Sequence, residues 1–308
     1  MRSRTRLRRM LGLALVGMAI ALFLAGHLHR HVVAMELVLL ALLLASGAVI
    51  RSIGRDEPPA SGLAPLIAIV GCDGSGKSTL SVDMCRGFGD VRPIALAYLG
   101  LGTGELGNRI KKWPVIGPSV ERKLAGKAKQ TRDAGEKIPG LPTALVVYGF
   151  TLLRVRRFRR VLALRERGIT VITDRYPQIE IPGFYDGPGL SAARAGSRAV
   201  AWLAARERRL YQWMAGFHPD LVLRLNVRAE TALARKPDHK PHLVAQKVAV
   251  TPLLRFQGAR ILEIDANASY DQVREQAFAA VDPILRRPDM PAEPAPLRSA
   301  RYDRRLRG

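Results

Sequence analysis

The stretch VGCDGSGKSTL, residues 70–80, follows a short apolar run, LIAIV, at residues 66–70. It fits the pattern G-x-x-x-x-G-K-[ST] from Gly71 to Ser78. The glycines allow backbone conformations that other residues avoid, so that successive N–H groups can face one anion. We expect Lys77 to reach the β- and γ-phosphates of a nucleotide, and Ser78 to offer its hydroxyl to Mg²⁺.

The order of strand, loop and helix favours nucleotide binding over its alternative, a glycine-rich turn without a ligand. The helix is predicted to begin at Lys77, where its positive N-terminal end would face the phosphates. The residues predicted to bind ATP are Gly71, Asp73, Gly74, Ser75, Gly76, Lys77, Ser78 and Thr79.

Four more apolar runs continue the strand pattern after residues 66–70: IALAYL (94–99), ITVITD (169–174), LVLRLNV (221–227) and ILEID (261–265). Long amphipathic segments separate them, which is typical of parallel βαβ units. The sequence therefore predicts an α/β fold, a P-loop NTPase three-layer αβα sandwich with a five-stranded parallel sheet, over residues 65–285.

The first fifty residues are predicted to cross the membrane. Residues 10–26 and 32–50 are apolar stretches that are each near the lower length limit for a transmembrane helix. A cleaved signal peptide would explain neither the second stretch nor the nucleotide loop. We expect a transmembrane helical hairpin over residues 10–50, followed by a polar linker at residues 51–64.

Basic residues flank both apolar stretches and predict the topology. Five arginines lie within residues 1–9, and Arg51 and Arg55 follow the second stretch, so both ends are expected in the cytoplasm. This predicts a multi-pass inner-membrane protein with the lipid bilayer as a partner. The basic, proline-rich tail at residues 286–308 is expected to be disordered.

Composition narrows the class of partner. The 49 Lys and Arg residues against 26 Asp and Glu give a formal charge of +23, which suits an anionic partner such as a nucleotide or lipid headgroup. Specific nucleic-acid binding is not expected, because no basic groove with interleaved aromatic residues is evident. The two cysteines, Cys72 and Cys85, are interpreted as free thiols in a reducing compartment.

A second motif, VITDRYPQ at residues 171–178, points to chemistry beyond binding. Residues at the carboxyl ends of parallel strands line the ligand crevice. Asp174 is therefore expected beside the phosphate loop, where its carboxylate can hold Mg²⁺ through water. Arg175 could bridge donor and acceptor as negative charge moves between them. The alternative is an ordinary Asp–Arg surface pair after a strand.

With both motifs, residues 65–285 resemble the thymidylate kinase family. The resemblance is carried by DGSGKST (73–79), Asp174-Arg175-Tyr176, HPDLVLRLNVRAETALAR (218–235) and ILEIDANAS (261–269). One departure is Asn226, where the family has an acid. The resemblance implies a kinase that uses ATP and Mg²⁺.

The resemblance also implies roles for individual residues. Catalytic roles fall on Lys77, Asp174, Arg175 and Arg235, and the metal-binding role on Ser78 and Asp174. Arg235 and Lys236 start the segment that corresponds to the mobile lid of the family, where Lys236 would contact the nucleotide. Substrate contacts fall on Asp73, Phe150, Arg154 and Tyr176. For Phe150 and Arg154 the alternative stays open, because Phe150 can be core and Arg154 belongs to an arginine-rich run.

Two segments depart from the thymidylate pattern. YLGLGTGELG (98–107) contains no arginine to grip a monophosphate, and the next arginine is Arg109. PQIEIPGFYDGPGL (177–190) contributes Glu180 and Asp186, which suit an acceptor rich in hydroxyls. The expected acceptor is a nucleoside monophosphate or another small hydroxyl or phosphate compound, with thymidylate itself expected to be a poor one.

Two functions remain at this stage. The first is a membrane-anchored ATP-dependent phosphotransferase. The alternative is an ATP-binding regulator or scaffold of a membrane assembly, such as one for envelope glycans, without phosphotransfer. A homodimer is left open in either case.

The predicted anchor can be tested by deletion. The full chain should sediment with membranes, whereas a chain lacking residues 1–55 should stay in the soluble fraction and still bind ATP. Protease added outside the cell should leave both ends intact, and external cleavage of the tail would contradict the predicted topology.

Overall fold

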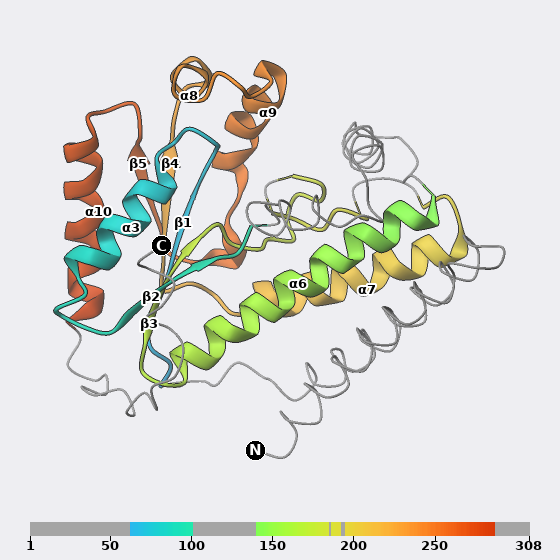
Figure 1. Cartoon of the computed structure of the whole chain (residues 1–308), viewed down its shortest axis with the longest axis horizontal. Coiled ribbons are helices and arrows are strands. Elements are labelled where there is room, and N and C mark those ends of the chain that lie inside the picture. Colours follow the sequence, from blue (N-terminus) through green and yellow to red (C-terminus); the bar gives the residue numbers. More distant parts are fainter. Residues whose placement is uncertain (1–61, 101–139, 185, 192–194, 287–308) are drawn as a thin grey trace, which may run out of the picture. The chain divides into compact units, whose positions relative to one another are not determined.

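The computed structural model of the chain describes residues 62–100, 140–184, 186–191 and 195–286 (Figure 1). Contacts divide the chain into two compact units. The sheet unit comprises described residues 62–99, 157–176 and 218–286. The helical unit comprises described residues 100, 140–156, 177–184, 186–191 and 195–217.

The sheet unit contains five strands and most of the helices that the structure describes. Its elements are β1 (Leu66–Gly71), α3 (Lys77–Gly87), β2 (Ile94–Tyr98), β3 (Thr170–Asp174), β4 (Leu221–Asn226), α8 (Ala229–Arg235), α9 (Pro241–Val250), the short helices η1 (Thr251–Leu253) and η2 (Phe256–Gly258), β5 (Ile261–Asp265) and α10 (Tyr270–Leu285). Helix α6 (Leu141–Arg165) has residues in both units, and α7 (Arg198–Ala215) belongs to the helical unit.

The five strands form one sheet in the order β2-β3-β1-β4-β5, and every pairing is parallel. Strand β1 lies at the centre and is buried along its whole length, as its uninterrupted apolar sequence requires. Each strand ends within one residue of the bounds expected from the sequence. The prediction of a five-stranded parallel sheet is confirmed.

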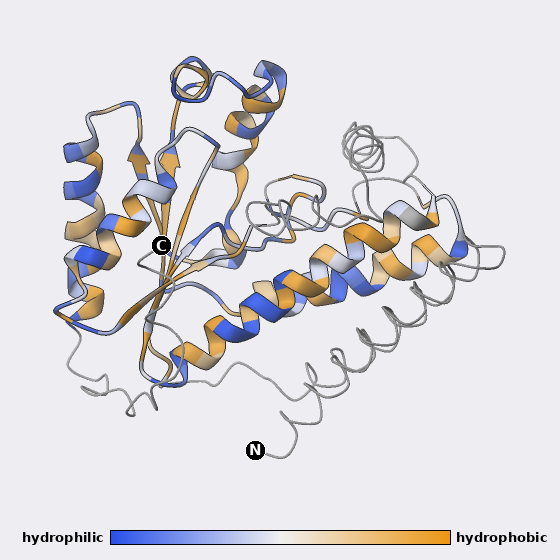
Figure 2. Ribbon diagram, in the orientation of Figure 1, coloured by the Kyte–Doolittle hydropathy of each residue, from blue (hydrophilic) through white to orange (hydrophobic). Residues whose placement is uncertain are grey.

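Helices α3 and α10 lie side by side in the sheet unit. The rings of Phe88 and Phe278 stack with centroids 4.7 Å apart, and the Tyr270 hydroxyl donates to Asp83 at 2.5 Å. A capping box between Ser269 and Gln272 starts α10. Figure 2 shows α10 alternating between hydrophilic and hydrophobic residues, whereas the strands are largely hydrophobic. The full three-layer arrangement stays a prediction, because α6 and α7 lie partly or wholly in the other unit.

A buried arginine in β4 is a feature that the apolar run did not reveal. Arg224 is 1% exposed and donates to Glu263 of β5 at 2.7 Å and to the backbone carbonyl of Pro252 at 3.0 Å. It also donates to the carbonyl of Leu254. Asn226, which stands where the family resemblance expects an acid, donates to the same Glu263. These bonds tie the segment after α9 to the end of the sheet.

The helical unit is organised around two buried polar side chains. Glu207 of α7 accepts hydrogen bonds from the Thr151 hydroxyl and from the backbone N–H groups of Gly189 and Leu190. Arg154 of α6 is fully buried and pairs with Asp186. Polar groups at this depth need partners, so both networks hold the loop after residue 177 against the helices.

No helix among the described residues is long and apolar enough to cross a membrane. The hairpin predicted over residues 10–50, the linker up to residue 61 and the tail from residue 287 lie outside the described residues. The same holds for residues 101–139, which include Arg109, and for residue 185.

The raised pKa of the buried Glu207 carboxyl should make the stability of the protein depend on pH. Burial raises its pKa from about 4.5 to about 7, against the opposing effect of its hydrogen-bond donors and Arg154. The folded chain therefore binds this proton more tightly than the unfolded chain. The free energy of unfolding should therefore fall by roughly 3 kcal/mol as the pH rises from 4.5 to about 7. Once Glu207 is ionised in both states, this group should cause no further change.

Urea unfolding of the full chain between pH 4.5 and 8 measures this contribution. Glu207→Gln should remove it, so that the difference between variant and wild type changes along this pH range. Glu275→Gln, at an exposed position of α10, is the matched control. A pH-independent difference for the Glu207 variant would show that this carboxyl keeps its ordinary pKa.

Candidate functional site

The loop between β1 and α3 passes very close to the backbone of β4 and of α8. A Cβ on Gly71 would lie 2.6 Å from the Ser75 hydroxyl and 2.7 Å from the carbonyl oxygen of Leu225. Gly74 has a φ of +88°, and a Cβ there would lie 2.6 Å from the carbonyl oxygen of Ala232. Both positions therefore require glycine, and the loop can run between β4 and α8 only with these residues.

Lys77 begins α3, as the sequence predicted. Its side chain is buried, with 6% exposed, and Nζ donates to the carbonyl oxygen of Cys72 at 2.7 Å. Burial, and to a smaller extent the charge of Arg175, lower the pKa of this ammonium to about 8. The N-cap, Gly76, has no side chain to cap the helix, which leaves its positive end suited to a phosphate.

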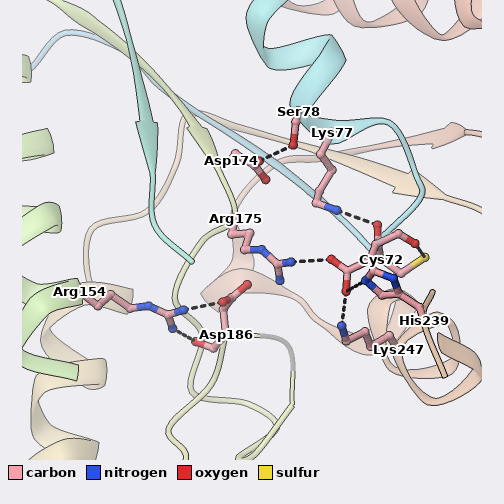
Figure 3. Close-up of polar contacts among 10 residues, drawn as sticks. Cys72, Lys77, Ser78, Arg154, Asp174, Arg175, Asp186, His239 and Lys247 are labelled. Atoms are coloured by element: carbon pink, nitrogen blue, oxygen red, sulfur yellow. Dashed lines mark hydrogen bonds and ion pairs between the residues drawn. The ribbon is translucent and has the colours of Figure 1, made fainter. Parts of the chain in front are cut away.

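The two sequence motifs meet at Ser78 and Asp174. The Ser78 hydroxyl donates to Oδ2 of Asp174 at 2.9 Å, as Figure 3 shows. Asp174 is 8% exposed, and its Oδ1 is buried without a hydrogen-bond partner in the described part of the chain. A hydroxyl beside an unsatisfied carboxylate oxygen fits Mg²⁺, which prefers oxygen ligands and bound water.

Arg175 links β3 to the phosphate loop. Its φ of 74° is uncommon for a residue with a side chain, and its backbone N–H donates to Ile69 of β1 at 3.0 Å. The guanidinium donates to Oδ1 of Asp73 at 2.6 Å. A residue held in a strained conformation at the edge of a ligand loop is a candidate for function.

Lys247 is a residue of this cluster that sequence reasoning missed. It lies on α9, and its ammonium pairs with Oδ2 of Asp73, opposite the oxygen that Arg175 contacts (Figure 3). His239 lies 3.9 Å from the same Oδ2 atom. No motif marks Lys247, since it stands 174 residues from Asp73 in a segment with ordinary helical character.

The charges around Asp73 set its protonation. Burial raises the pKa of this carboxyl, but the hydrogen bond from Lys247 and the charges of Arg175, Lys247 and Lys77 outweigh burial and hold the pKa well below its usual range. Asp73 is therefore ionised at any physiological pH, and it balances part of the positive charge around the loop.

The predicted lid residues have different surroundings. Arg235 donates to the carbonyl oxygens of Ala266 at 2.9 Å and Gly74 at 3.3 Å, so it ties the end of α8 to the loop. Lys236 follows at the end of α8 and is exposed. The catalytic role of Arg235 and the nucleotide contact of Lys236 stay predictions.

The predicted substrate residues outside the loop are mostly engaged within the protein. Arg154 donates to Asp186 at 2.5 Å (Figure 3). It also donates to the Tyr211 hydroxyl at 2.8 Å, and would have to exchange these partners to contact a substrate. Tyr176 is 2% exposed, with its ring edge-on to Phe158 at 5.9 Å. We assign Tyr176 to the core. Phe150 is half-buried on α6.

Comparison with known proteins identifies close relatives. The chain is 45% identical over 217 residues to the "Uncharacterized ATP-binding protein YghR" of Escherichia coli strain K12, covering 70% of this chain and 86% of YghR. It is 42% identical over 221 residues to the "Uncharacterized ATP-binding protein YghS" of the same strain, covering 71% of this chain and 93% of YghS. No protein-family model matches the chain.

The buried ammonium of Lys77 gives a direct test of the phosphate loop. Lys77→Ala should weaken ATP binding about 10- to 100-fold, because one charge-assisted contact in a dry site is lost. Calorimetric titration with ATP and Mg²⁺ measures this loss, and circular dichroism checks that the fold persists. Lys240→Ala, at an exposed lysine before α9, is the control and should bind ATP as the wild type does. Unchanged affinity in the Lys77 variant would remove the phosphate-binding interpretation.

Proposed function

The chain belongs to the family of ATP-binding proteins that includes YghR and YghS, and we propose that it is an ATP-dependent phosphotransferase acting on a small-molecule acceptor. ATP is the expected donor because the names of both relatives state ATP binding and because the loop after β1 has the pattern that holds its phosphates.

The observation that carries the proposal is the pairing of the two motifs. The hydrogen bond of 2.9 Å between Ser78 and Asp174 places a hydroxyl and a carboxylate together beside Lys77, on the first turn of α3 and the end of β3. Ser78 and Asp174 are the residues that would hold Mg²⁺, which would neutralise charge on the phosphates. Lys77 would contact the β- and γ-phosphates.

The presence of Arg175 favours phosphoryl transfer over ATP binding without transfer. During transfer the bond between the γ-phosphorus and the bridging oxygen of ADP breaks, and a bond from the acceptor oxygen forms. If the acceptor is a hydroxyl, its proton leaves to a base or to water. Negative charge is spread over the phosphoryl oxygens between donor and acceptor, and a guanidinium at that point stabilises it. A module that only binds ATP has little use for an arginine there.

Two features of the chain bear on the acceptor. The loop after residue 177 contains Glu180 and Asp186, but Asp186 is already paired with Arg154, so its carboxylate is not free for a hydroxyl. Arg154 is likewise occupied and is no ready substitute for a gripping arginine. We propose a small acceptor with a hydroxyl or phosphate group, among which thymidylate is a poor substrate.

We further propose that the enzyme works at the membrane, with its catalytic part in the cytoplasm. The support is the pair of apolar stretches at residues 10–26 and 32–50 and the basic residues that flank them. A tether suits a pathway at the envelope better than the supply of soluble DNA precursors. The alternative, a regulator or scaffold that binds ATP without transferring phosphate, is separated from the enzyme by the following experiment.

The full chain is incubated with ATP labelled at the γ-phosphate, Mg²⁺ and a panel of nucleoside monophosphates, sugars and lipid-linked sugars. We expect label to appear in one acceptor class. Arg175→Ala should lower the turnover on the order of 10³-fold while leaving ATP affinity nearly unchanged, because the arginine acts more strongly in the transition state.

Each result has a distinct meaning. ATP binding without transfer to any acceptor would favour the scaffold. Equal losses of affinity and turnover in Arg175→Ala would make Arg175 a contact of the ground state. Turnover of thymidine monophosphate in the ordinary enzyme range of about 1–10³ s⁻¹ would restore thymidylate as the acceptor.

A further inference from the structure

The carboxylate of Asp73 is divided between two cations from distant elements. Its Oδ1 accepts from Arg175 at the end of β3, and its Oδ2 accepts from Lys247 of α9. Asp73 itself lies inside the phosphate loop, two residues after Gly71. One anion in the loop thus holds an arginine and a lysine at the same place, although the two cations stand 72 positions apart in the chain (247 minus 175).

Burial distinguishes this cluster from an ordinary surface ion pair. The side chains of Asp73, Arg175 and Lys247 are 16%, 20% and 28% exposed. Ion pairs on the open surface contribute little, whereas charges that are mostly removed from water interact strongly. The cluster carries two positive charges against one negative charge, and Lys77 adds a further ammonium close to the loop.

Lys247 differs from the other cations of α8 and α9. Arg235 is directed at two backbone carbonyls, and Lys236 and Lys240 are exposed. Among the lysines and arginines described in this segment, Lys247 reaches the phosphate loop through the carboxylate of Asp73, and His239 lies 3.9 Å from the same oxygen. The position of Lys247 therefore matches that of Arg175, which we have proposed to stabilise the transferring phosphoryl group.

We propose that Lys247 is a second catalytic cation that contacts the transferring phosphoryl group together with Arg175, and that Asp73 is the positioning residue that holds both. This inference rests on the proposed phosphotransferase function. Two cations on different elements can serve different oxygens of the same phosphoryl group, where charge is spread during transfer. Because Asp73 already orients both side chains, little reorganisation is needed when the reaction occurs.

The competing interpretation is a purely structural contact in which Lys247 only anchors α9 to the loop. Such an anchor would affect binding of ADP and of a transition-state analogue alike. A cation that acts in transfer would affect the analogue alone, because ADP lacks the phosphoryl group. The difference between these two affinities therefore separates the roles.

The experiment titrates the full chain with ADP and Mg²⁺, with and without tetrafluoroaluminate, which takes the place of the transferring phosphoryl group. The wild type should bind ADP more tightly with tetrafluoroaluminate than without it. Lys247→Ala should lose about 10- to 100-fold of this gain, the loss expected for one charge-assisted contact, while its affinity for ADP alone stays within about twofold. Lys247→Arg should recover part of the gain, and Lys240→Ala should behave as the wild type.

Asp73→Asn tests the positioning role in the same assay. If Asp73 acts by holding Lys247, the double variant Asp73→Asn, Lys247→Ala should lose no more of the gain than the larger of the two single losses. Fully additive losses would overturn the positioning role of Asp73.

The outcomes separate this inference from the proposed function. A wild type that binds ADP equally with and without tetrafluoroaluminate would overturn the role of Lys247, because no contact to the analogue would be present, whereas transfer of label from ATP decides whether the phosphotransferase stands. A normal wild-type gain that survives in Lys247→Ala would overturn the role of Lys247 and leave the phosphotransferase standing. Equal losses for ADP and for the analogue would identify Lys247 as a structural anchor, which also overturns the inference.

Discussion

The parallel pairing of β1 with β3 is the constraint on which the rest of the site depends. Its register places Ile69 opposite Asp174, so both strands end at the same edge of the sheet. The bond from the Arg175 N–H to Ile69 extends this pairing by one residue beyond β3. The phosphate loop that follows β1 therefore begins beside the acid and the arginine that follow β3. A shift in the register would separate Ser78 from Asp174 and leave a loop without its carboxylate.

Charge balance is the second organising feature of the sheet unit. Lys77, Arg175 and Lys247 gather around the loop, and the burial of Lys77 lowers its pKa to about 8. Such a concentration of positive charge would be costly without compensation, which Asp73 and Asp174 supply in part. The remaining positive charge suits a polyanion such as a nucleoside triphosphate. The same residues thus stabilise the loop and prepare it for its ligand.

In the helical unit, by contrast, buried charged side chains stabilise local structure. Arg154 and Asp186 pair in the interior, and Glu207 takes hydrogen bonds from two backbone N–H groups of the loop. These bonds satisfy backbone N–H groups of the loop and hold the loop against the helices. Of the acids that the sequence offers for an acceptor, Asp186 is therefore occupied inside the protein. Because Arg154, Asp186 and Glu207 are engaged within the protein, other groups would have to bind the proposed acceptor.

The sequence by itself determined the five strands, the helix that begins at Lys77 and the convergence of Ser78 with Asp174. These features depend on local apolar runs, on a motif of fixed spacing and on the rule that parallel strands end at one edge. Only the tertiary structure decided which side chains meet across long separations. In the folded chain Lys247 pairs with Asp73, and Arg154 pairs with Asp186. Arg224 is buried within an otherwise apolar strand, and Tyr176 lies in the core. The physical reason is that an ion pair carries no local periodicity, and its partners become neighbours only when the chain folds.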